Sequence, residues 1–163
     1  MPARASRPHA APLRGRAIPA LSLSIQLGDG VRELPAPRAR LRRWVAAAID
    51  SDATLTLRFV GEREGRALNA QYRHRDHATN VLTFAYHGEG ERVRADIVVC
   101  MPVVRREARA QRKHPAAHLA HLVIHGVLHA CGHDHDQPGP AARMEAAEVA
   151  LLARFGFADP WRG

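Results

Sequence analysis

The residues best suited to chemistry in this chain form a histidine cluster that begins at His125. His129 is four residues further on, so on a helix the two imidazoles share one face, with Cβ atoms about 5–6 Å apart. Both rings can therefore reach one metal ion, since imidazole nitrogens coordinate zinc at about 2.1 Å. Gly132 can take a positive φ and turn the chain off the helix axis, which lets His135 return as a third ligand. The cluster predicts a three-histidine metal site.

Such a site would be a catalytic centre rather than a structural one. Three protein ligands leave one coordination position open for water, whereas structural zinc sites are closed by four. The spacing, with histidines at positions 1, 5 and 11 and glycine at position 8, is that of the long zinc-protease signature. In that signature a glutamate follows the first histidine and acts as general base. Gly126 stands there in this chain, which argues against peptide hydrolysis.

Other side chains near the cluster are alternative participants: His118, His121, Cys131, His133, Asp134 and Asp136. His121 continues the four-residue spacing towards the N-terminus, but three ligands on one helix would not need the glycine turn. Asp134 or Asp136 is better suited to accept a hydrogen bond from a ligand histidine. Cys131 is two residues from His129, about 200° around the helix, so we expect it to face the core.

The elements that position this cluster are predicted from hydrophobic periodicity. Four short runs that alternate or are rich in β-branched and aromatic residues predict strands: residues 21–27, 54–60, 81–86 and 96–100. Five stretches with an apolar stripe predict helices: residues 35–49, 62–72, 102–112, 115–131 and, after a break at residues 138–140, 141–155. Interspersed strands and helices indicate a single mixed α/β domain. Its longest apolar helix ends at Gly132, a natural C-terminal cap.

Length and composition restrict the class of protein. The chain has 163 residues, of which 46% are hydrophobic, enough for one domain with a substantial core. No apolar run approaches the roughly 18 residues that a membrane span needs, so no membrane partner is expected. Cys100 and Cys131 do not make a disulfide scaffold, which fits a reducing compartment. We therefore expect a cytoplasmic protein.

The net charge of +8 favours an anionic partner such as nucleic acid. Lys113 is the only lysine and alanine is abundant, so a composition bias could also explain the many arginines. Residues 1–20 carry four arginines, four prolines and no acidic residue, and they lack the apolar segment of a secretory signal. We expect a disordered basic extension there, with RNA contact as the alternative, followed by one domain over residues 21–158.

These motifs resemble those of the YbeY family of bacterial endoribonucleases and rRNA maturation factors. The family pattern H-G-x-L-H-x-x-G-x-D-H is matched at every fixed position by residues 125–135. The other matching segments are Leu68-Asn69, Tyr72-Arg73, Asp76, residues 79–84 and Asp96-Ile97-Val98. The departures are alanines in place of the family's usual proline or glycine: Ala78, Ala85 and Ala95. The resemblance covers about residues 60–135 and leaves the histidines intact.

The resemblance implies a zincin-like fold with a four-stranded mixed sheet and a metal-dependent, single-strand-specific endoribonuclease. It implies that His125, His129 and His135 bind the metal and that Arg73 is the functional arginine facing the cleft. The expected cofactor is one zinc ion per chain, with nickel as the alternative because imidazole suits both. The implied role is in 16S rRNA 3′-end maturation and ribosome quality control, with precursor rRNA, the small ribosomal subunit, ribosomal proteins and the Era GTPase as partners.

The residue types also indicate which reaction the predicted site could perform. A metal bound by neutral imidazoles can polarise a phosphoryl oxygen or lower the pKa of its water, and Arg73 could stabilise charge on the phosphorus oxygens. Without the resemblance, a surface pair of Arg73 with Asp76 explains that arginine equally well. No residue stands out as the general base. The alternatives are a metallohydrolase of peptide or small-molecule bonds, weakened by Gly126, and a non-catalytic ribosome-assembly factor with a structural metal.

Overall fold

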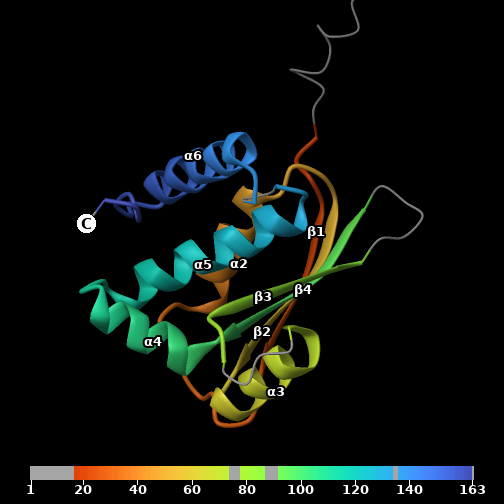
Figure 1. Cartoon of the computed structure of the whole chain (residues 1–163). Coiled ribbons are helices and arrows are strands. Elements are labelled where there is room, and N and C mark those ends of the chain that lie inside the picture. The colour runs from red at the N-terminus through yellow and green to blue at the C-terminus, as the bar shows by residue number, and fades with distance from the viewer. Residues whose placement is uncertain (1–16, 74–77, 87–91, 134–135, 163) are drawn as a thin grey trace, which may run out of the picture.

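The computed structural model describes residues 17–73, 78–86, 92–133 and 136–162. The strands are β1 (Leu21–Leu27), β2 (Ala53–Val60), β3 (Val81–Tyr86) and β4 (Val93–Cys100). The helices are α2 (Arg38–Ala48), α3 (Glu62–Arg73), α4 (Met101–Ala110), α5 (Pro115–Ala130) and α6 (Pro138–Arg154). They form one α/β domain in which helices cover both faces of a single sheet (Figure 1). The predicted fold class, with four strands and five helices, is confirmed.

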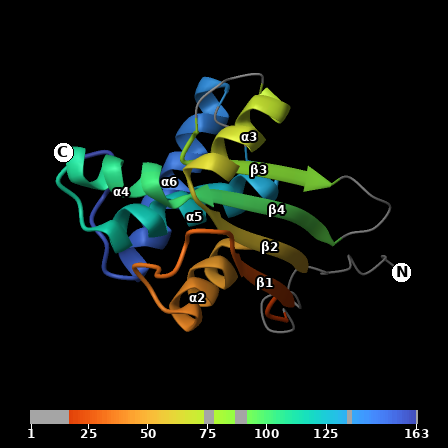
Figure 2. The same cartoon turned by 90° about the horizontal axis from the view of Figure 1, so that it is seen from below.

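The sheet is mixed, as predicted. Its strand order is β1-β2-β4-β3, and Figure 2 shows the four strands side by side in that order. β1 and β4 both pair in parallel with β2, whereas the edge strand β3 runs antiparallel to β4. The chain passes from β4 directly into α4 at Cys100 and Met101, so the sheet fixes where α4 begins.

Most of the hydrophobic core lies between the sheet and the helices α2 and α5. Trp44 of α2, Phe59 of β2 and Ile124 of α5 are fully buried there. A smaller cluster, which includes Val98 and Cys100, packs with Leu68 of α3 on the opposite face. Because successive strand residues point to opposite faces, β4 contributes to both clusters. Cys100 is 2% exposed and belongs to the smaller cluster.

Several predicted boundaries differ from the observed ones, among them the start of α2 at Arg38 rather than at Pro35. Two of the differences have a clear physical reason. β4 begins at Val93 rather than at Asp96, because its pairing with β2 extends back to the register partners Ala53 and Val93. α6 begins at Pro138 rather than at Ala141. The Pro-Gly-Pro segment, expected as a break, forms the first turn of the helix, where the missing proline N–H has no intrahelical acceptor to lose.

The helix α5 is the central helix of the domain. It packs against α2, α4, α6 and two strands of the sheet. Gly126 permits its close approach to the sheet, since a Cβ there would lie 2.9 Å from Ile97 Cγ2 and 3.4 Å from Thr83 Oγ1. A side chain at this position would therefore collide with β4, which explains why glycine follows the first histidine of the cluster. Among the helices in the described part of the chain, none is both long and apolar enough to cross a membrane.

Candidate metal centre

The first two predicted ligands lie on the last turns of α5, and a glycine turn follows them. His125 and His129 are both half-buried. Gly132 has a φ of 101°, as predicted for the residue that ends this helix. Its N–H donates to the His129 carbonyl at 3.0 Å, and the next N–H, from His133, donates to the Leu128 carbonyl at 3.0 Å. This is the Schellman arrangement, which ends a helix and redirects the chain.

The main feature that the sequence analysis missed is Glu148 on α6. This carboxylate is 1% exposed and lies between two imidazoles, with Oε2 at 2.6 Å from His125 Nδ1 and Oε1 at 2.9 Å from His121 Nε2. Burial raises the pKa of Glu148, but the hydrogen bonds from His121 and His125 together outweigh this, so its pKa is lowered. The carboxylate is therefore ionised at neutral pH, and both histidines donate their N–H groups to it.

This hydrogen bonding fixes a different tautomer on each of the two histidines. When His125 donates from Nδ1, its Nε2 carries the lone pair, which is the form a metal ligand needs. His121 donates from Nε2 instead, and its Nδ1 is buried without a partner among the described residues. The sequence offered His121 as an alternative ligand. Its Nε2 is occupied by the hydrogen bond to Glu148.

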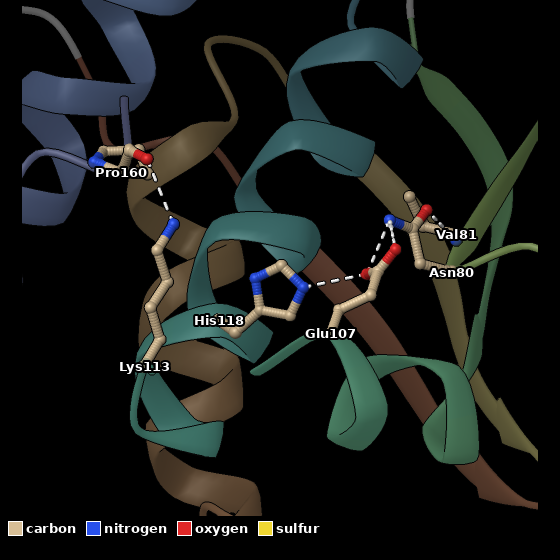
Figure 3. Close-up of polar contacts among 6 residues, drawn as sticks. All are labelled: Asn80, Val81, Glu107, Lys113, His118 and Pro160. Atoms are coloured by element: carbon tan, nitrogen blue, oxygen red, sulfur yellow. Dashed lines mark hydrogen bonds and ion pairs between the residues drawn. The ribbon is translucent and has the colours of Figure 1, made fainter. Parts of the chain in front are cut away.

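A second carboxylate holds the next histidine of α5. His118 donates from Nε2 to Glu107 Oε1 at 2.9 Å, and Asn80 Nδ2 donates to the same oxygen at 3.0 Å (Figure 3). The Asn80 side chain is itself fixed, since its Oδ1 accepts from the Val81 N–H at 2.7 Å. Glu107 of α4 therefore links α5 to the start of β3. His118 is occupied by this link and is not positioned as a metal ligand.

The four histidines of this part of α5 form a row. His118, His121, His125 and His129 are spaced by three, four and four residues, the spacing that places side chains on one helix face. The first three line a cleft of about 400 Å³. Further lining residues come from α4, β3 and the C-terminal segment: Asn80, Val81, Glu107, Lys113, Pro160 and Trp161. The candidate ligand His125 thus opens onto a cleft large enough for part of a substrate.

The described residues supply only part of the predicted metal site. Among them, no three His, Cys, Asp or Glu side chains converge to hold a metal ion, and the third predicted ligand, His135, lies outside them. The donor chemistry nevertheless fits a metal of the zinc class. A metal-binding histidine usually coordinates through one ring nitrogen and donates the N–H of the other to a carboxylate, a backbone carbonyl or a water. His125 with the buried carboxylate of Glu148 has this arrangement.

The other candidates from the sequence divide into two groups. Cys131 packs against the main core, and burial raises the pKa of its thiol to about 11, so the prediction that it faces the core is confirmed. The backbone of Arg73 ends α3, but its side chain lies outside the described residues, as do Asp76 and Asp134 entirely.

A signal for the two missed carboxylates was present in the sequence. Glu148 lies four residues from Met144 and from Leu152, both buried, on the core stripe of α6. Glu107 likewise lies next to the buried Ala108 on α4. A carboxylate on the apolar stripe of a helix needs a buried partner, because burying an unpaired charge is costly. That pattern marks Glu148 as part of a site.

Comparison with known proteins gives one consistent result. A family model described as Endoribonuclease YbeY matches residues 35–156. A protein named Endoribonuclease YbeY from Cupriavidus necator is 54% identical over 149 residues, covering 89% of this chain and 75% of that protein. One of the same name from Methylibium petroleiphilum is 50% identical over 143 residues, covering 88% and 95%. The solution structure of TM1509 from Thermotoga maritima matches with a TM-score of 0.51 and 25% identity, over 86% of this chain and 99% of that one.

Proposed function

The chain belongs to the YbeY family of endoribonucleases, and from this premise we propose that it is a metal-dependent, single-strand-specific endoribonuclease of 16S rRNA 3′-end maturation and ribosome quality control. The observation that carries the proposal is that the first two histidines of the family's motif lie on α5, with His125 backed by the buried carboxylate of Glu148. The net charge of +8 supports an RNA substrate. The proposed partners are precursor rRNA, the small ribosomal subunit, ribosomal proteins and the Era GTPase, in the cytoplasm.

The proposed metal ligands are His125, His129 and His135, with one zinc ion per chain and nickel as the alternative. Two observations support this set. Glu148 selects the His125 tautomer whose Nε2 carries the lone pair, and the turn at Gly132 redirects the chain after His129. When bound, the metal would polarise a phosphoryl oxygen or lower the pKa of its water. The contribution of this chain is to hold the imidazoles in place and to provide the cleft in front of His125.

The proposed phosphate-binding residue is Arg73. Its backbone ends α3, which lies on the opposite face of the sheet from α5. The end of α3 contacts the edge strand that borders the cleft: the ring of the preceding residue, Tyr72, lies 4.7 Å from the ring of Phe84 on β3, and Val81 of the same strand lines the cleft. A guanidinium there would stabilise charge on the phosphorus oxygens.

The proposal is tested by incubating purified protein with single-stranded rRNA and with casein, each with and without a chelator. We expect RNA cleavage that the chelator abolishes, and intact casein. In a parallel reaction, Arg73→Ala should keep its metal by elemental analysis but lose RNA cleavage. Casein cleavage would favour a peptide metallohydrolase, although the packing of Gly126 on Ile97 leaves no room for the protease glutamate. A metal-bound protein that cleaves neither would favour a non-catalytic assembly factor.

A further inference from the structure

Residues 157–162 follow α6, fold back onto α5 and lie beyond residues 35–156, which the family model matches. Two contacts hold this segment against the rest of the domain, and a third is a turn within the segment. The ring of Phe157 packs at 5.8 Å on the buried ring of Trp44. Lys113 Nζ donates to the Pro160 carbonyl at 3.0 Å (Figure 3), and the Trp161 N–H donates to Asp159 Oδ1 at 2.8 Å. The backbone that carries Trp161 is therefore held against the domain.

The indole of Trp161 lies next to the candidate metal centre. Its ring is perpendicular to that of His121, with centroids 5.3 Å apart. His121 shares the carboxylate of Glu148 with His125, so one imidazole separates the indole from the predicted ligand. Trp161 lines the 400 Å³ cleft that reaches His125 and also an adjoining cleft of about 660 Å³. It thus forms a wall shared by the two.

The larger cleft is basic. Arg112, Lys113 and Arg162 line it, and Asp159 is the only acidic residue among its described lining residues. That aspartate lies 3.7 Å from Arg162 Nε, so most of the positive charge is not neutralised locally. A cleft of this charge suits the phosphates of a nucleic acid strand.

The exposure of Trp161 is not explained by packing. The indole is 53% exposed. The other exposed large hydrophobic side chains in the described ranges are Ile18, Leu27, Tyr72 and Tyr86. None of these lines either of the two clefts. An exposed aromatic ring beside cations is the usual platform on which single-stranded nucleic acids stack their bases.

We propose that Trp161, Arg112 and Arg162 form a nucleobase-binding subsite, in which one unpaired base of the RNA stacks on the indole and the arginines bind the adjoining phosphates. The inference rests on the proposed function and adds a place where the strand is held beside the cleft. Bases in a duplex are already stacked on their neighbours and cannot enter. The subsite would therefore contribute to a preference for single strands.

Tryptophan fluorescence tests the subsite directly, because the chain has two tryptophans and Trp44 is fully buried. A non-cleavable 2′-O-methyl phosphorothioate oligonucleotide is titrated into the metal-loaded protein. We expect the single strand to quench the emission of Trp161 and to protect it from acrylamide, whereas the duplex form should bind without this quenching. A single strand that binds by anisotropy but leaves the emission and its acrylamide quenching unchanged would refute the proposal.

Matched variants give an independent test. Trp161→Ala should raise the Kd for the single strand by about 5- to 100-fold, the loss expected when a stacking aromatic is removed, whereas Trp161→Phe should change it less than about 3-fold. Tyr86→Ala, which removes a ring of similar exposure at the end of β3, should bind as wild type. An unchanged Kd for Trp161→Ala, with cleavage intact, would refute the subsite alone. A wild-type protein that neither binds nor cleaves RNA would refute the proposed function as well.

Discussion

The two carboxylates that face the histidine row of α5 differ in their surroundings. Glu148 is almost fully buried and accepts from two imidazoles, one of which is the proposed ligand His125. The side chain of Glu107 is 33% exposed and shares its acceptor oxygens between His118 and Asn80. The first carboxylate orients the proposed ligand His125 within the protein, and the second links α4 to α5 and to the start of β3 at the cleft surface. Residues of the same two types thus take different roles because burial and partners differ.

The largest expected effect is on metal binding, when the histidine partners of the two carboxylates are replaced. His125→Ala should abolish metal binding and RNA cleavage together, since one of three ligands is lost. His118→Asn should retain a full equivalent of metal, because His118 is engaged with Glu107. Elemental analysis of both purified variants measures this difference. Metal loss in His118→Asn would contradict the distinction between His125 as a proposed ligand and His118 as the partner of Glu107.

Replacement of the buried carboxylate should have the next largest effect. Glu148→Gln leaves one amide oxygen to serve two N–H donors, so one imidazole loses its acceptor. We expect metal affinity to fall about 10- to 100-fold and the free energy of unfolding to fall by about 1.5–3 kcal/mol, the contribution of a hydrogen bond to a charged group. Titration with zinc and a chelator competitor measures the first, and urea denaturation of the metal-free protein measures the second. Wild-type zinc affinity would contradict the positioning role.

The face of α5 that packs on the sheet gives a contrasting prediction, because it carries no site residue. Gly126→Ala should lower the free energy of unfolding by about 1–3 kcal/mol through overpacking against Ile97. The control is Gly139→Ala on α6, where the nearest atom to an added Cβ is Arg143 Nη1 at 3.6 Å. That variant should be neutral or slightly stabilising, since alanine has the higher helix propensity. The denaturant midpoint of Gly126→Ala should therefore fall, whereas that of Gly139→Ala should stay the same or rise. Equal midpoints would count against the close approach of α5 to the sheet.

The smallest expected effect is at the partly exposed carboxylate. Glu107→Gln retains an oxygen that can accept from His118 or Asn80, and water can reach the rest of the side chain. We expect a loss of about 0.5–1.5 kcal/mol in the free energy of unfolding, as for a single hydrogen bond, with unchanged zinc affinity. The same denaturation and zinc titrations measure both values beside Glu148→Gln. A loss of zinc affinity equal to that of Glu148→Gln would remove the distinction between the two groups.

Much of the fold and part of the site follow from local sequence patterns. The helix predicted over residues 115–131 is observed as Pro115–Ala130, because Pro115, the apolar periodicity and Gly132 are all local signals. The start of β4 at Val93 was missed because its first residues adopt the strand conformation through their pairing with β2. The types of these residues do not by themselves predict that pairing. The role of Glu148 was missed because it depends on a partner 23 residues away.

The sequence alone determined the type of fold, the family and the spacing of the histidine motif, since these depend on periodicity and on residues close together in the chain. Only the tertiary structure decided which nitrogen of each imidazole is occupied and which carboxylate occupies it. It also decided that Trp161, at the far end of the chain, lies against His121. These features arise from packing between helices, because burial leaves a charged or polar group only the partners that the fold brings to it.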